Sequence, residues 1–268
     1  MANPIKVVIH GASGRNGQRL VALCHEDPDL CLMGAVVGKT SSSLGLDAGT
    51  LAGISPIELK VTSDLPQDCD VVIDFSTPEA CMALIEQCVL HEVPAVIATT
   101  GLTSSQIATI QAASHKLPVC YAPNMSVAVN VAMKLVEQAA AALKNTPGGV
   151  DVEIIERHHR MKEDSPSGTA LKFGQIVANQ MAIDAHVHGR QGIVGKRPQS
   201  EIGYHAVRIG DDAGQHTVCF GMMGEIIEIR VGASNRDPYA KGAIMAAKWL
   251  VNHPAGMYSM WNVLGLEI

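Results

Sequence analysis

Short β-branched runs alternate with helix-periodic segments through the first half of this chain. Apolar runs occur at residues 5–9, 31–37, 70–75, 94–98 and 117–121. Segments with helical spacing lie between or after these runs, at residues 18–24, 80–90, 103–115 and 127–144. Parallel strands need crossover connections and are buried on both faces, so they read as nearly continuous apolar runs. The pattern therefore predicts an α/β fold with a doubly wound parallel sheet. Residues 41–68 break the alternation and are predicted to be mostly irregular, with one weak strand near residues 57–61.

A glycine-rich turn joins the first strand to the first helix. It reads Gly11, Ala12, Ser13, Gly14, Arg15, Asn16 and Gly17. In a dinucleotide fingerprint, the first glycine allows a tight turn, the second lets the backbone approach a pyrophosphate, and the third lets helix and strand pack closely. The spacing here is G-x-x-G-x-x-G, so the alternative is a glycine-rich turn that binds nothing. With the flanking strand and helix, it favours a Rossmann-like dinucleotide site.

Small, hydroxyl and amide residues recur where the other strands end. Ligands of such sheets bind outside the carboxyl ends of the strands. Each of these residues alone is ordinary turn chemistry, but their recurrence predicts a cofactor crevice. The candidates are Gly38, Lys39, Phe75, Ser76, Thr77, Ala98, Thr99, Thr100, Ala122, Pro123, Asn124 and Met125.

The end of the second strand bears on the choice of cofactor. An NAD-preferring site usually has an acidic residue there to bind the ribose 2′-hydroxyl, and Gly38 cannot do so. Lys39 could meet a 2′-phosphate, although a solvated loop lysine is an equal alternative. The sequence therefore favours NADPH, with NADH still open.

The second half of the chain has a different pattern. Strands are predicted at residues 202–209, 217–220 and 225–231 without helices between them, which indicates a mixed or antiparallel sheet in a smaller α+β domain. The polar, glycine-rich residues 186–200 are predicted to form a mobile loop. A helix at 238–251 is expected to return to the first domain, which gives domains of 1–126 with 237–268, and of 127–236.

One segment, residues 151–170, combines proton-transfer groups with an anion cradle. A strand leads into His158, His159 and Lys162, and Ser167 is a candidate N-cap of the next helix. The backbone N–H groups of Gly168 and Thr169 would then face any anion in front of that helix. The alternative is a polar loop on a solvated surface. No further ligand follows at useful spacing, so no metal site is predicted.

Composition excludes several other classes of protein. The net charge is −6 and only 3% of residues are aromatic, which argues against a nucleic-acid partner. No apolar stretch is long enough to span a membrane, and the N-terminus lacks a signal-peptide pattern, so a cytoplasmic protein is expected. The 7 cysteines are scattered and are expected to be reduced thiols.

Residues 156–170 resemble the signature E-x-H-H-x-x-K-x-D-x-P-S-G-T-A of the 4-hydroxy-tetrahydrodipicolinate (dihydrodipicolinate) reductase family of lysine and diaminopimelate biosynthesis. The resemblance implies reduction of a cyclic, unsaturated dicarboxylate imine by NAD(P)H in a homotetramer. It implies His158 as general acid/base and Lys162 as proton donor, with the substrate bound by His159, Ser167, Gly168 and Thr169. It assigns dinucleotide binding to the first domain, and substrate binding and oligomerisation to the second. Gly38 departs from the family, where an acidic residue is common.

Two other functions stay open. Another NAD(P)-dependent dehydrogenase of the aspartate family would explain the glycine turn but not the segment at 151–170. A non-catalytic NADPH-binding sensor would bind the dinucleotide without turnover.

Overall fold

The computed structural model describes residues 3–267. It divides the chain into two compact units, Met1–Val127 with Arg236–Ile268, and Ala128–Asn235. The first unit is discontinuous in sequence because the second is inserted into it. Each unit is described by itself below.

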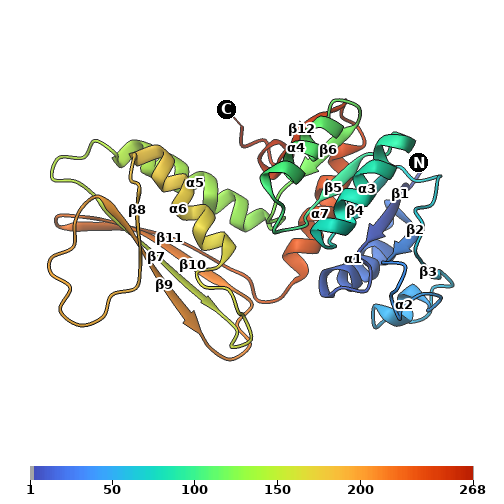
Figure 1. Cartoon of the computed structure of the whole chain (residues 1–268), viewed down its shortest axis with the longest axis horizontal. Coiled ribbons are helices and arrows are strands. Elements are labelled where there is room, and N and C mark those ends of the chain that lie inside the picture. Colours follow the sequence, from blue (N-terminus) through green and yellow to red (C-terminus); the bar gives the residue numbers. More distant parts are fainter. Residues whose placement is uncertain (1–2, 268) are drawn as a thin grey trace. The chain divides into compact units, whose positions relative to one another are not determined.

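A seven-stranded sheet forms the centre of the first unit, in the order β12-β6-β5-β4-β1-β2-β3 (Figure 1). Every neighbouring pair is parallel. The predicted doubly wound parallel sheet is therefore confirmed. Its strands are β1 (Ile5–His10), β2 (Leu30–Val36), β3 (Val61–Thr62), β4 (Val71–Asp74), β5 (Ala95–Ile97), β6 (Pro118–Tyr121) and β12 (Gly256–Tyr258).

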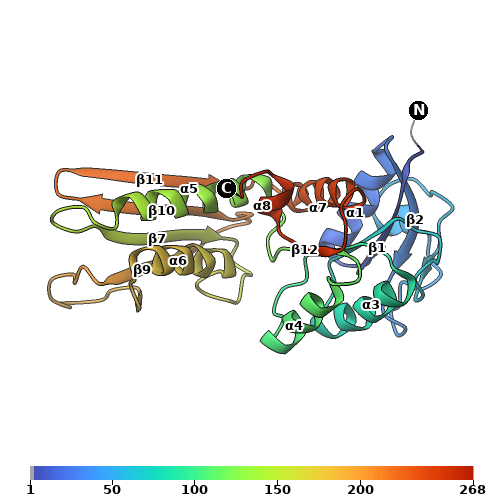
Figure 2. The ribbon, with the colours of Figure 1, turned by 90° about the horizontal axis from the view of Figure 1, so that it is seen from above.

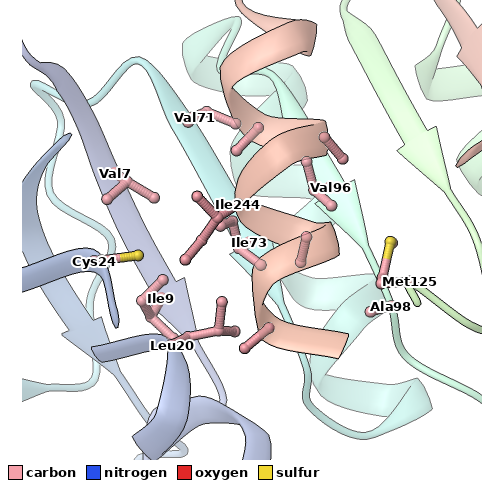
Figure 3. Packing of buried hydrophobic residues seen from close by; sticks show 14 of the residues in the cluster. Val7, Ile9, Leu20, Cys24, Val71, Ile73, Val96, Ala98, Met125 and Ile244 are labelled. Carbon is pink, nitrogen blue, oxygen red and sulfur yellow. The ribbon is translucent and has the colours of Figure 1, made fainter. Parts of the chain in front are cut away.

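Helices cover both faces of this sheet. Successive side chains of a strand point to opposite faces, so Val7 and Ile9 of β1 join the core under α1 and α7, whereas Val8 joins the core under α3 and α4. Figure 3 shows the first of these cores, in which Leu20 and Ile244 pack against the strands. Burying each such side chain stabilises the fold by roughly 1.5–3 kcal/mol. The helices are α1 (Arg15–Glu26), α2 (Ala48–Leu51), α3 (Pro78–His91), α4 (Ser104–Ala113), α7 (Asp237–Leu250) and α8 (Met260–Val263).

The second unit is a mixed five-stranded sheet in the order β11-β10-β7-β9-β8. The strand β7 pairs parallel with β9 and antiparallel with β10, which confirms a mixed sheet. Two helices lie along one face of it in both views (Figures 1 and 2). The elements are α5 (Val127–Leu143), β7 (Asp151–His158), α6 (Gly168–Met181), β8 (Ala185–His188), β9 (Glu201–Arg208), β10 (Gln215–Met222) and β11 (Glu225–Gly232).

Two predicted irregular regions contain regular structure. Residues 41–68 include the short helix α2, capped by Asp47, whose carboxylate accepts hydrogen bonds from Thr50 N and Ile57 N. Of the weak strand expected near residues 57–61, only Val61 belongs to a strand, the two-residue β3. The predicted loop at 186–200 begins within β8, because His186 is 2.8 Å from the hydroxyl of Tyr204 and its backbone pairs with β9. Residues 189–200 contain no helix or strand.

Candidate functional site

The glycine turn of the first unit is packed so closely that its first and third glycines have no room for a side chain. A Cβ on Gly11 would lie 2.4 Å from the carbonyl oxygen of Phe75, and Gly11 has a φ of +80°. A Cβ on Gly17 would lie 2.1 Å from the carbonyl oxygen of Gly11. Only glycine fits at these two positions, as a dinucleotide turn requires.

The N-terminus of α1 is suited to an anion. Its N-cap, Gly14, provides no side-chain hydrogen bond to the first turn. The side chain of Gln18 donates to the carbonyl of Ser13 at 3.0 Å and so fixes the turn ahead of the helix. Asn16 Oδ1 is buried and accepts no hydrogen bond; within residues 3–267, it is the one buried side-chain nitrogen or oxygen without a partner. An uncapped helix start and an unpaired acceptor beside it fit the phosphates and polar groups of a dinucleotide.

A buried carboxylate, Asp74, ties together the ends of three strands. His10 Nδ1 is 2.7 Å from one oxygen of Asp74, and the hydroxyl of Thr99 donates to the other at 2.6 Å. The backbone N–H of Ser76 in turn donates to the Thr99 hydroxyl at 3.1 Å. Burial raises the pKa of Asp74, but the hydrogen bonds from His10 and Thr99 outweigh it and hold that pKa below its usual value. Phe75 and Ser76 thereby lie against Gly11 of the glycine turn, and Thr99 is bonded to Ser76.

The remaining predicted cofactor residues differ in exposure. Gly38 and Lys39 are exposed at the end of β2, and a Cβ on Gly38 would meet nothing. Met125 is buried, with its side chain in the core that Figure 3 shows, as is Ala12. Only the backbone of these two residues could therefore face a ligand. Ala122 is bonded through its N–H to the carbonyl of Ile97 at 3.1 Å.

In the second unit, the strand β7 ends at His158. Alternate residues of β7 are buried, so Glu156 and His158 share the face that points to the core. The ring nitrogen Nδ1 of His158 is 2.6 Å from Glu156 Oε2. Both nitrogens Nη1 and Nη2 of Arg208 donate to the same carboxylate at 2.8 Å. The pKa of Glu156 is lowered because these hydrogen bonds outweigh the effect of burial.

The helix α6 begins beside this group. The hydroxyl of Ser167 accepts from Ala170 N at 3.2 Å, as the predicted N-cap should, and is 3.0 Å from His216 Nε2. These contacts bury Ser167, whereas Gly168 is exposed with open space where a Cβ would be. The cradle that this helix offers an anion therefore consists of backbone N–H groups at Gly168 and Thr169.

His159 and Lys162 lie in the loop between β7 and α6. The side chain of Lys162 donates to Asp164 Oδ1 at 2.8 Å and is 21% exposed. The backbone N–H of Lys162 donates to the carbonyl of His159 at 3.1 Å, which closes a turn at this point. Lys162 therefore combines a defined position with access to solvent.

Two imidazoles meet at the site. The rings of His158 and His216 are 5.2 Å apart, edge to face. Burial lowers the pKa of His158, Glu156 opposes that effect, and the charges of Lys162 and Arg208 add to it. Burial, with a smaller contribution from the neighbouring His158, lowers the pKa of His216 to about 4. His216 is therefore neutral at physiological pH and serves as a hydrogen-bonding group.

Four residues of the candidate site were not predicted: Glu156, Arg208, His216 and Asp74. Glu156 had a usable signal, since it lies two residues before His158 and so on the same face of a strand. Arg208 and His216 come from β9 and β10, and they reach the site only through the register that pairs them with His158 and Glu156. Among the described residues, no group of three or more His, Cys, Asp or Glu side chains could hold a metal ion. No helix in that range is long and apolar enough to cross a membrane.

Comparisons with known proteins cover nearly the whole chain. Residues 5–125 match the family model described as dihydrodipicolinate reductase, N-terminus, and residues 128–264 match dihydrodipicolinate reductase, C-terminus. The 4-hydroxy-tetrahydrodipicolinate reductase of Rhodopirellula baltica is 51% identical over 98% of this chain and 97% of its own. That of Syntrophotalea carbinolica is 45% identical over 98% of this chain and 100% of its own.

A solved structure agrees with these relatives. Dipicolinate-bound dihydrodipicolinate reductase from Paenisporosarcina sp. TG-14 superposes with a TM-score of 0.75, is 26% identical, and covers 96% of this chain and 97% of its own. The resemblance that the segment at 156–170 predicted is thereby confirmed. The chain belongs to the dihydrodipicolinate reductase family.

Proposed function

We propose that this protein catalyses the NAD(P)H-dependent reduction of 4-hydroxy-tetrahydrodipicolinate to tetrahydrodipicolinate, with loss of water, in lysine and diaminopimelate biosynthesis. Relatives that carry this name match 98% of the chain. The observation that carries the proposal is the pairing of His158 with a buried, ionised Glu156 beside the start of α6. A proton-transfer group and an anion cradle are then fixed in one unit, as a carboxylated substrate that must be protonated requires.

The first unit supplies the coenzyme site in this proposal. A bound reduced nicotinamide would supply the hydride. The turn at 11–17 would hold the pyrophosphate against the N-terminus of α1, and Asn16 Oδ1 would accept a hydrogen bond from a donor of the dinucleotide. The strand ends around Asp74 would support the rest of the site. Residues 1–126 with 237–268 are thus proposed as the dinucleotide-binding domain, and residues 127–236 as the substrate-binding and oligomerisation domain.

The second unit supplies the proton and binds the substrate in this proposal. Hydride addition to a conjugated imine places negative charge on the acceptor, which an adjacent acid must neutralise. His158 and Lys162 are the proposed acids. The backbone N–H groups of Gly168 and Thr169 would bind one carboxylate at the start of α6, with His159 and the cap Ser167 completing the substrate site.

One assay separates this function from its alternatives. NADPH consumption is followed with the heterocycle that the preceding aldolase makes in situ, and in parallel with aspartate semialdehyde alone. Rapid consumption with the heterocycle only is the expected result. Consumption with aspartate semialdehyde would instead indicate another aspartate-family dehydrogenase. Tight NADPH binding with no turnover on either would indicate a non-catalytic sensor.

The preference for NADPH rests on Lys39. Lys39 is exposed next to Gly38, at the end of β2, where it could meet a 2′-phosphate. Replacing Lys39 by Glu is expected to raise KM for NADPH on the order of 10-fold or more while leaving NADH little changed, because a charge-assisted bond is lost and a like charge added. Steady-state kinetics with both coenzymes measures this. A higher kcat/KM with NADH in the wild type, or an unmoved preference in Lys39→Glu, contradicts the assignment.

The proposed homotetramer would form through the second unit. One face of its sheet carries α5 and α6, and the other exposes Ile155, Val207 and Ile226 from three strands. The same face carries the ion pairs of Glu153 with Arg190 and Arg197, and exposed apolar side chains beside polar ones are typical of surfaces that a second copy covers. Light scattering on the purified protein is expected to give the mass of four chains. A monomeric mass at micromolar concentration would refute the assembly.

A further inference from the structure

The carboxylate of Glu156 is the point at which the groups of the second-unit site are joined. It is 1% exposed and accepts from three residues. His158 Nδ1 and Arg208 Nη1 reach Oε2 at 2.6 and 2.8 Å, and Arg208 Nη2 and Ser167 N reach Oε1 at 2.8 and 3.1 Å. Both oxygens therefore have two partners each, and the carboxylate has one well-defined orientation.

We infer that Glu156, held by Arg208, is a positioning residue that fixes the ring of His158 so that Nε2 is the atom that exchanges the proton. This inference rests on the proposed reduction for its role in turnover. Its structural content, the tautomer and orientation of one imidazole, can be measured without turnover.

Elementary hydrogen-bond chemistry determines the tautomer. An ionised carboxylate only accepts hydrogen bonds, so Nδ1 of His158 must carry its hydrogen whether the ring is neutral or charged. The proton that comes and goes is then on Nε2. Within residues 3–267, no hydrogen bond is made to that atom. Gly214 packs against this edge of the ring, where any larger residue would clash, since a Cβ there would lie 2.8 Å from Nε2.

The ion pair of Glu156 and Arg208 also contacts the loop that carries Lys162. Arg208 Nη2 also donates to the carbonyl oxygen of Asp164 at 2.7 Å, and the side chain of Asp164 accepts from Lys162 at 2.8 Å. Ser167 N, bonded to Glu156, belongs to the cap of α6. One ion pair between neighbouring parts of the sheet thus holds the imidazole, the lysine loop and the helix start in a common frame.

The charges around His158 determine in which direction its pKa shifts when a neighbour is replaced. Glu156 on β7, Lys162 in the following loop, Arg208 on β9, His216 on β10 and Asp212 in the 209–214 loop all act on it. Glu156 favours the charged ring, while Lys162 and Arg208 oppose it. Removing the carboxylate must lower the pH at which His158 titrates, and removing the guanidinium must raise it. A general loosening of the site would instead shift the His158 titration in the same direction in both variants.

The experiment is a ¹⁵N NMR titration of the His158 ring in the full-length protein without substrate, assigned by difference with His158→Gln. In the wild type, the neutral ring is expected as the Nδ1–H tautomer. In Glu156→Gln, we expect a midpoint at lower pH and a shift toward the Nε2–H tautomer, because the glutamine amide can donate to Nδ1. In Arg208→Gln, the midpoint is expected at higher pH. Turnover by Glu156→Gln should fall by up to about 10⁴-fold, the loss that follows when the carboxylate behind a catalytic imidazole is replaced by its amide.

Glu153→Gln is the matched control. Glu153 lies on the same strand but on its opposite face, and its carboxylate also accepts from Arg190, Arg197 and His205. This variant should leave the His158 titration unchanged. An unchanged tautomer and midpoint in a folded Glu156→Gln overturns the inference. If Glu156→Gln does not fold, the inference is overturned when the titration midpoint of His158 in Arg208→Gln moves to lower pH or does not move. A wild type that consumes no NADPH with the heterocycle refutes the proposed function, and leaves the NMR result intact.

Discussion

Replacing His158 by Gln, or Lys162 by Ala, is expected to lower kcat by about 10²–10⁴-fold, the usual contribution of a positioned proton donor. KM should change far less, because these groups act on the charge that develops during the reaction. His158 lies at the end of β7 with Nδ1 bonded to Glu156, and Lys162 follows in the adjoining loop. Steady-state NADPH consumption with the heterocycle made in situ gives both constants.

His205→Gln provides the matched control for His158→Gln. His205 is also a histidine paired with a glutamate, with its Nε2 atom 2.7 Å from Glu153, but it lies on β9 away from the start of α6. Its replacement should leave kcat within about 2-fold of the wild type, since surface substitutions outside a site rarely have larger effects. A near-normal kcat in His158→Gln or Lys162→Ala would remove that residue from the mechanism.

Replacing Gly17 by Ala is expected to weaken NADPH binding on the order of 10²-fold, because the added Cβ forces the turn out of position and the overpacking costs about 1–3 kcal/mol. That Cβ would lie 2.1 Å from the carbonyl oxygen of Gly11 and 2.8 Å from Cα of Ala12, both of them backbone atoms that cannot rotate away. Fluorescence titration with NADPH measures the affinity. Circular dichroism at increasing temperature measures the accompanying loss of stability.

Gly221→Ala separates the local clash from a general effect of adding a methyl group. Its Cβ would meet Asp151 at 3.8 Å, an ordinary contact in the sheet of the second unit. This variant should bind NADPH as the wild type does. A folded Gly17→Ala with unchanged NADPH affinity would show that the turn does not hold the dinucleotide.

The parallel sheet was predictable because each of its long strands is buried on both faces. Val7, Val8 and Ile9 are all apolar for that reason, and a run of this kind is visible without a structure. The helix α2 and the strand β8 were not predictable. Asp47 caps α2 through hydrogen bonds that reach Ile57, ten residues away, and the edge strand β8 has four mostly exposed residues, of which only two are apolar. In both cases, contacts formed only on folding outweigh local preference.

The candidate site divides in the same way. His158, Lys162 and Ser167 lie within ten residues of each other, so they can be predicted together from a single segment. Arg208 and His216 reach Glu156 only because β9 and β10 pair with β7 in one register. A shift by one residue would turn both side chains to the opposite face of the sheet. That register has no local sequence signal, so the residues that orient His158 could not be named beforehand.

The discontinuous first unit has a consequence for the order of events on the ribosome. The strands at Val7 and Ile73 are synthesised early, yet the helix that covers this face, α7, begins only at Asp237. All of Ala128–Asn235 is translated in between. The growing polypeptide must therefore hold an apolar layer that only α1 partly covers for more than a hundred codons. A chaperone that shields this layer, or early folding of the inserted unit, would protect the nascent chain from aggregation until α7 emerges.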